Sequence, residues 1–253
     1  MIVLGGFFAV LMGMTLSLIG AGGSIMTVPI LVYIIGLPAT IATAYSLFIV
    51  GSTALVGAIS YWRRGEIFLA KSLLFAFPAL IAVWCTRTVF LPSMPKTILN
   101  VSLDHWIMLF FAFLMLIAST LMFRSKNKQQ LNSNAAISKS EFIKLIFGSI
   151  SVGFITGIVG AGGGFLIIPS LVAIFKFTIK QAVGTSLAII AINSLVGFGG
   201  DYTTGISLDW LLLSSFICCT ISGIFIGSKI SHKLNTQNIK LFFSFFSLLI
   251  GIG

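Results

Sequence analysis

Two short glycine clusters are the residues of this sequence best suited to binding chemistry. A Gly-Ala-Gly-Gly run at residues 20–23 recurs at residues 160–163, followed by Ser24 in the first copy and Gly164 in the second. Both clusters interrupt long apolar stretches, where glycine disfavours a continuous helix. A helix that restarts after such a break begins with unpaired backbone N–H groups and a partial positive charge. The clusters therefore predict two helix starts that can bind an anion without a basic side chain. The candidate residues are Gly20, Gly22, Gly23, Ser24, Gly160, Gly162, Gly163 and Gly164.

A structural role for the glycines stays open at this point. Small residues also let membrane helices approach one another closely, and a duplicated glycine break is expected of either role. The clusters do not match a dinucleotide-binding or phosphate-loop pattern, because no strand precedes them and no Lys-Ser or Lys-Thr follows them.

Hydroxyl residues follow each cluster at the start of the next apolar stretch. Tyr45-Ser46 in the first half aligns with Thr185-Ser186 in the second. Such hydroxyls either bind an oxyanion or donate to the backbone carbonyl one turn back, which is common in membrane helices. Asn193 lies two helical turns beyond Ser186, and an amide inside a span needs a neighbouring helix or a ligand. Ser46, Thr185, Ser186 and Asn193 therefore join the candidate site.

Titratable residues are too scarce to indicate catalysis. No cluster has metal-ligand or triad spacing, so we expect no enzyme activity, no metal and no cofactor. All acidic residues fall near the predicted ends of apolar spans, and Asp201 is the one closest to a position where it could act within the membrane. The five are Glu66, Asp104, Glu141, Asp201 and Asp209.

The composition indicates that these elements lie in a membrane. Of the 253 residues 58% are hydrophobic and 8% are charged, whereas soluble domains carry roughly 25% charged residues. The net charge of +10 would suggest nucleic acid in a soluble protein. Here the apolar stretches are long enough to span a bilayer, so we read the basic residues as topology signals that face anionic lipids. A nucleic-acid partner is not expected.

The chain consists of two repeats. At an offset of 140 residues, 17 of the 53 positions in residues 13–65 match those in 153–205, including several Gly and Pro. A polar segment separates the halves. We therefore divide the chain into a first membrane repeat (1–123), a polar cytoplasmic linker (124–141) and a second membrane repeat (142–253), an organisation typical of transporters.

Basic residues favour one topology. If all eight apolar stretches cross the bilayer, eight cations lie on one side and seven on the other. Residues 2–35, however, would form a helix of about 51 Å at roughly 1.5 Å per residue, longer than the membrane core. If this stretch and 142–175 fold back at their glycine clusters, 13 cations lie on one side and only Arg87 and Lys96 on the other.

The second topology defines the fold class that we expect. The protein is an all-α integral membrane protein of two homologous halves, each with a glycine-broken re-entrant helix pair followed by three transmembrane helices. Because three crossings per half is an odd number, the halves are inverted repeats. Eight plain spans are the alternative.

The duplicated motif resembles the sulfite exporter TauE/SafE family. The motifs that carry the likeness are Gly20 to Pro29, Gly160 to Pro169, Ala182 to Leu187, Trp62 to Gly65 and Gly205 to Trp210. The family's Ala-Thr-Ser-Leu is replaced by Ala44-Tyr45-Ser46-Leu47 in the first repeat. The resemblance implies a multi-pass permease of the bacterial inner membrane for small anions such as sulfite or sulfonates.

The sequence thus predicts a secondary transporter or exporter of a small anion, working by alternating access around the paired helix starts. Its expected partners are the anionic substrate and membrane lipids. An anion channel, or a membrane enzyme or assembly factor without transport activity, is the alternative.

Overall fold

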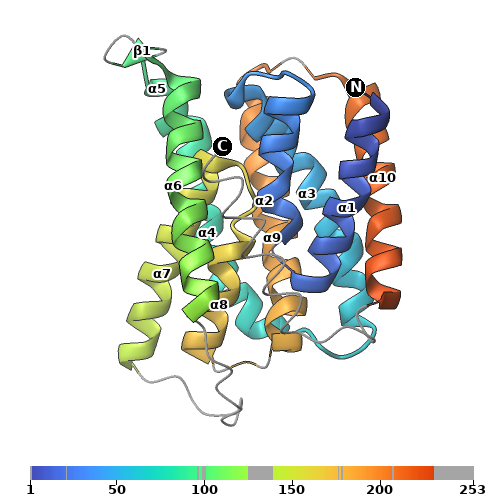
Figure 1. Ribbon diagram of the computed structural model, residues 1–253. Helices are drawn as coiled ribbons and strands as arrows, with labels where there is room; N and C mark the ends of the chain where they lie inside the picture. Colours follow the sequence, from blue (N-terminus) through green and yellow to red (C-terminus); the bar gives the residue numbers. More distant parts are fainter. Residues whose placement is uncertain are drawn as a thin grey trace.

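The computed structural model describes residues 2–20, 22–95, 97–98, 101–124, 139–175, 177, 179–206 and 208–230. These residues form a bundle of helices with one short β-hairpin at its upper edge (Figure 1). The last apolar stretch, 238–253, and most of the linker lie outside the described residues.

The elements of the first half are α1 (Ile2–Ile19), α2 (Gly22–Pro29), the π-helical η1 (Ile30–Ile34), α3 (Ala39–Trp62), α4 (Leu69–Cys85), the π-helical η2 (Thr86–Phe90), α5 (Leu91–Ser93), β1 (Thr97–Ile98), β2 (Val101–Ser102) and α6 (Leu103–Arg124). Those of the second half are α7 (Lys139–Val159), α8 (Gly164–Phe175), α9 (Ile179–Thr203) and α10 (Trp210–Ile230). Helix interruptions fall at both glycine clusters, as predicted.

Five apolar helical segments of the described chain are long enough to cross a membrane, which agrees with an all-α membrane protein. Two of them are central, since 72% of the residues in an 18-residue window of the α3 and α9 spans are buried, against 33% in the corresponding windows of the α4 and α10 spans. The outer helices expose large apolar side chains such as Phe77 and Phe225. The spans are Ala39–Trp62, Ser72–Ser93, Phe142–Val159, Gln181–Thr203 and Trp210–Lys229.

The two halves pack on each other reciprocally. At the centre α3 contacts α9, while α1 packs against α10 and α7 packs against α4. Two glycines that match in the repeat alignment allow the outer contacts. A Cβ at Gly13 would overlap the carbonyl oxygen of Thr220, and a Cβ at Gly153 would overlap that of Ala79. In Figure 1, α1 begins near the top of the bundle and α7 begins near the bottom.

The replacement Gly13→Ala tests this close approach. We expect it to lower the free energy of unfolding in detergent by about 1–3 kcal/mol, because the new methyl group collides with backbone rather than with a flexible side chain. Gly6→Ala in the same helix is the matched control, since its Cβ would lie 3.7 Å from the Cys219 sulfur. Equal stability of the two variants would contradict the packing described.

Candidate functional site

The second glycine break has a backbone that only glycine adopts easily. Gly160, Gly162 and Gly163 have φ angles of 70°, 66° and 67°, in the left-handed region that other residues rarely enter. The turn ends α7 and starts α8 at Gly164, the first residue of a 12-residue helix. The amides of Leu166 and Ile167 donate to the Gly163 carbonyl. The N–H groups that precede them have no partner within the helix, and the start of α8 carries the positive end of the helix dipole.

Three helices enclose this break. Thr43 of α3 lies against Gly160, with its Cβ 2.5 Å from the place where a glycine Cβ would be. Ser194 of α9 lies 3.0 Å from the equivalent point of Gly162, and Thr156 of α7 is in close contact with Gly163. The turn is therefore bordered by three hydroxyl side chains, one from each helix.

Buried polar groups without partners gather around the second break. The hydroxyls of Ser46, Thr156 and Ser194 have no hydrogen-bond partner among the described residues. Ser46 is three residues after Thr43 and four before Val50, so it lies on the face of α3 whose neighbouring residues contact the break. Each buried polar group left unpaired costs about 1–3 kcal/mol. Such a concentration is rare in a finished core and is typical of a site that receives a ligand.

Asn193 of α9 adds an unpaired amide. The side chain is buried, and neither Oδ1 nor Nδ2 has a partner among the described residues. Gly197 and Gly200 follow it on the same face of α9 and pack against Val83 and Arg87. Of the two roles open for this amide, a hydrogen bond to a neighbouring helix is not found among the described residues.

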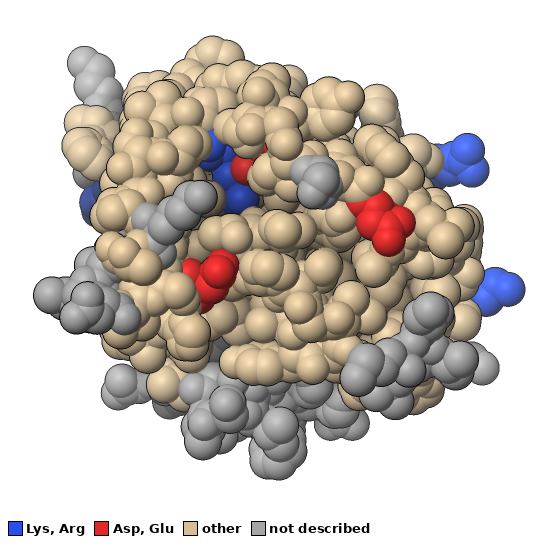
Figure 2. All heavy atoms as spheres, turned by 90° about the horizontal axis from the view of Figure 1, so that it is seen from above, with Lys and Arg blue, Asp and Glu red and all other residues tan. Residues whose placement is uncertain are grey.

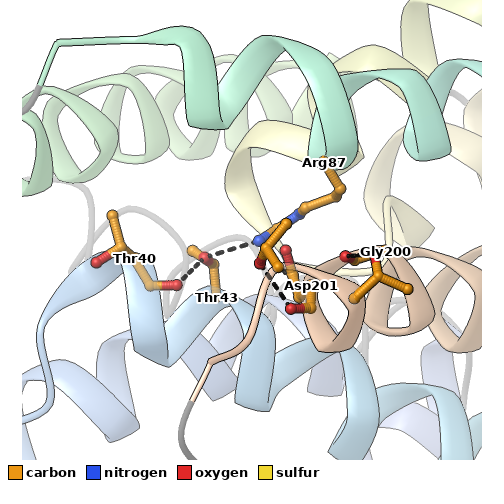
Figure 3. A network of polar contacts seen from close by, with 7 residues as sticks. Thr40, Thr43, Arg87, Gly200 and Asp201 are labelled. Atoms are coloured by element: carbon orange, nitrogen blue, oxygen red, sulfur yellow. Dashed lines mark hydrogen bonds and ion pairs between the residues drawn. The ribbon is translucent and has the colours of Figure 1, made fainter.

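A buried ion pair adjoins the same break (Figure 3). Nη1 of Arg87, in η2, donates to Oδ2 of Asp201 in α9 at 3.0 Å and to the hydroxyl of Thr43 at 3.2 Å. Thr43 in turn donates to the carbonyl oxygen of Thr40. Arg87 is 1% exposed and Asp201 is 3% exposed, and they are the two charged residues buried within the described part of the chain. Thr43 thus joins the guanidinium to the glycine turn.

The ion pair lies toward the upper end of the bundle, where η2 and the last turn of α9 are found. Seen from above, the face is largely uncharged, and basic and acidic atoms meet at the bottom of a hollow (Figure 2). A separate cavity of about 720 Å³ lies along α6, lined mainly by apolar side chains such as Leu37 and Trp106. The residues at the second break are instead packed closely and shielded from solvent.

The structure corrects one expectation from the sequence, because Arg87 is buried and is not a loop cation on the membrane surface. Asp201, the acidic residue that the sequence singled out, is buried near the end of α9. Gly200 lies against the stem of Arg87, since a Cβ there would be 3.2 Å from the Arg87 Cβ. At the repeat offset of 140 residues, the positions that correspond to Arg87 and Asp201 are Gly227 and Tyr61. Neither charge is therefore repeated in the other half of the chain.

The first glycine break is organised differently. Gly20 has a φ of 73°, and Ser186 of α9 donates to its carbonyl at 3.4 Å and to that of Val183 at 2.8 Å. Thr27 donates to the carbonyl of Gly23. Ser24 is fully buried in α2, which begins at Gly22. Thr185 is also buried and accepts a long hydrogen bond of 3.5 Å from the Phe68 amide. The hydroxyls of Ser186 and Thr27 at this break thus bond to backbone carbonyls.

The predicted site residues therefore separate into two groups. Gly20, Gly22, Gly23, Ser24 and Ser186 lie at or next to the first break, and Thr185 lies on α9 beside Phe68. Gly160, Gly162, Gly163, Gly164 and Ser46 lie at the second, with Asn193 next in sequence to Ser194. Arg87, Thr43, Thr156 and Ser194 are the polar residues at the second break that the sequence did not single out.

Comparison with known proteins identifies relatives of the whole chain. The family model described as "Sulfite exporter TauE/SafE" matches residues 5–253. A "Probable membrane transporter protein YdhB" from Bacillus subtilis (strain 168) is 28% identical over 235 residues, covering 91% of this chain and 90% of that protein. A "Probable membrane transporter protein" from Xylella fastidiosa (strain 9a5c) is 26% identical, covering 90% and 84%.

The similarity extends to archaea. A "Probable membrane transporter protein MJ0441" from Methanocaldococcus jannaschii is 22% identical over 258 residues, which cover 96% of this chain and 90% of that protein. No solved structure is significantly similar to the chain. The resemblance predicted from the duplicated glycine motif is confirmed.

Removing one member of the ion pair tests whether it is buried as described. We expect Asp201→Ala to lower the free energy of unfolding in detergent by about 3–5 kcal/mol, because Arg87 is left as a buried charge without a counter-ion. The double variant Arg87→Met/Asp201→Ala removes both charges and is expected to recover part of that loss. A double variant less stable than Asp201→Ala alone would contradict this account.

Proposed function

The chain belongs to the sulfite exporter TauE/SafE family, and from this premise we propose that it is a secondary transporter of a small oxyanion. Sulfite and small sulfonates are the substrates that the family suggests. The observation that carries the proposal is the set of unpaired buried hydroxyls of Ser46, Thr156 and Ser194 around the start of α8.

The chemistry of this region suits an oxyanion. A sulfite or sulfonate group presents several acceptor oxygens and no apolar face at its charged end. Hydroxyl donors and the N–H groups of a helix start can donate hydrogen bonds to those oxygens. Binding would supply the partners that the described residues lack, and so would offset the cost of the unpaired groups.

We further propose that the two halves are inverted repeats that move against each other. Reciprocal packing supports this, because Gly20 lies against Val183 and Gly160 lies against Thr43, two contacts related by the repeat offset. The opposite starting ends of α1 and α7 in Figure 1 agree with it. In alternating access, the two halves would rock against each other along the α3–α9 contact and expose the second break to one side of the membrane at a time.

The proposed location is the bacterial inner membrane with the linker 124–141 in the cytoplasm. In the re-entrant topology, 13 cations lie on the cytoplasmic side and only Arg87 and Lys96 on the opposite side. Because Arg87 is buried, Lys96 is the cation that remains in a loop on the opposite side, and the positive-inside bias becomes stronger. The proposed activity is transport, with no chemical step performed on the anion.

Proteoliposome flux of labelled sulfite tests the function, and Ser46→Ala tests the site. We expect saturable transport by the wild-type protein. The variant should raise KM about fivefold, the equivalent of losing one hydrogen bond of about 1 kcal/mol. The same variant should be no less stable, because the hydroxyl it removes has no partner.

Ser72→Ala is the matched control, since this buried hydroxyl donates to the Phe68 carbonyl within its own helix. Its transport should remain as in the wild type. Transport by Ser46→Ala that is unchanged would contradict a substrate role for the second break, and flux that does not saturate would favour the channel.

Cysteine labelling tests the inverted repeat. Arg64 and Thr204 are equivalent positions in the turns after α3 and α9 and are exposed. After replacement of the free cysteines Cys85, Cys218 and Cys219, we expect Arg64→Cys and Thr204→Cys to react with a membrane-impermeant maleimide from opposite faces. Labelling of both from one face would contradict inversion.

A further inference from the structure

The guanidinium of Arg87 is only partly used by the protein. Arginine has five N–H donors, arranged so that Nε–H and one Nη–H point in parallel from one edge of the plane. Nη1 is bonded to Asp201 and Thr43, whereas Nε and Nη2 have no hydrogen-bond partner among the described residues. The free edge is the one that fits two oxygens of a carboxylate, sulfonate or phosphate group.

This arrangement differs from that of an ion pair that only stabilises a fold. Arginine and a carboxylate commonly pair through two parallel hydrogen bonds, which satisfies both groups. Here Asp201 meets a single nitrogen, Nη1, and Thr43 meets the same nitrogen. Both contacts hold the guanidinium in place from one end, and two donors are left buried and unpaired.

The position of the free edge agrees with a role in binding. Thr43 contacts both Arg87 and Gly160, so the guanidinium is one side chain away from the turn before α8. Along α9, Gly200 lies against Arg87, and Asn193 follows on the same face with its amide unpaired. This face of α9 therefore carries a small residue, Gly200, next to Arg87 and an unpaired amide, Asn193, two helical turns further into the bundle.

The ion pair has no counterpart at the repeat offset. Arg87 lies in the first repeat and Asp201 in the second, and the positions 140 residues away are Gly227 and Tyr61. The Tyr61 hydroxyl donates to the Ser17 carbonyl. The duplicated fold therefore does not require an ion pair at this place, and the pair occurs beside the break that has the unpaired buried donors.

We propose that Arg87 is the cationic anchor of the transported oxyanion and binds two of its oxygens through Nε and Nη2, with Asp201 and Thr43 positioning the guanidinium. The inference rests on the proposed transport function and deepens it. The free edge is closed to solvent in this structure, so the anion reaches it when the bundle opens. An oxyanion offers a separate oxygen to each of the two parallel N–H groups, so it is bound in preference to chloride, which offers both donors a single atom.

The test uses Arg87→Lys, which keeps the charge and removes the parallel donors. In proteoliposomes we expect this variant to raise KM for labelled sulfite about tenfold or more, the effect of losing one charge-assisted hydrogen bond. Competition by methanesulfonate should weaken in parallel. Arg63→Lys, the same replacement at an exposed arginine, is the matched control and should keep the wild-type KM.

A second variant covers the case in which Arg87→Lys does not fold. Asp201→Asn keeps an oxygen acceptor for Nη1 and removes the negative charge next to the anion. Sulfite should therefore raise its melting temperature more than that of the wild type, while chloride should not. A sulfite effect that is no larger than in the wild type would make the pair structural and overturn the inference.

The outcomes separate the two proposals. If the wild type transports sulfite and Arg87→Lys keeps its KM, the role of Arg87 is wrong and the transport function stands. If the wild type transports neither sulfite nor methanesulfonate, the proposed function fails, and the inference fails with it.

Discussion

Lipid offers no hydrogen bonds, so a helix that stops within an apolar stretch must have its freed backbone groups enclosed by protein. Both glycine clusters create this requirement, because α1 and α7 end at them and α2 and α8 start after them. The two most buried of the candidate spans, α3 and α9, run beside the breaks and supply the enclosure. The reciprocal packing of the two halves follows from the need to cover two such breaks at once.

The two breaks meet this requirement in different ways. At the first, Ser186 and Thr27 donate to carbonyl groups of the turn or of the helix beside it. At the second, the hydroxyls of Ser46, Thr156 and Ser194 lack partners among the described residues. The backbone differs as well, since Gly20 is the described cluster residue with a positive φ at the first break, whereas Gly160, Gly162 and Gly163 all have one at the second. The free energy lost through unpaired groups at the second break is what a bound anion can recover.

The sequence predicted the features that depend on backbone and composition. Glycine density marked both helix breaks, and the repeat offset matched Gly13 to Gly153, which hold equivalent close contacts. It could not predict which hydroxyls would be bonded, since Ser46 and Ser186 align but only Ser186 meets a described carbonyl. Arg87 was misplaced because a cation near a span end usually reaches the headgroups. The buried position of its side chain involves contacts with Gly200 and Asp201, which belong to another helix, α9.

The central claim is that an oxyanion binds at the second break, between the start of α8 and Arg87. Selenite resembles sulfite and scatters anomalously, so a crystal structure of the full chain grown with selenite locates the anion directly. We predict one selenium peak within hydrogen-bonding reach of the free edge of Arg87, on the side of the second break. A peak at the first break or in the cavity along α6, with none at the second break, would contradict the account.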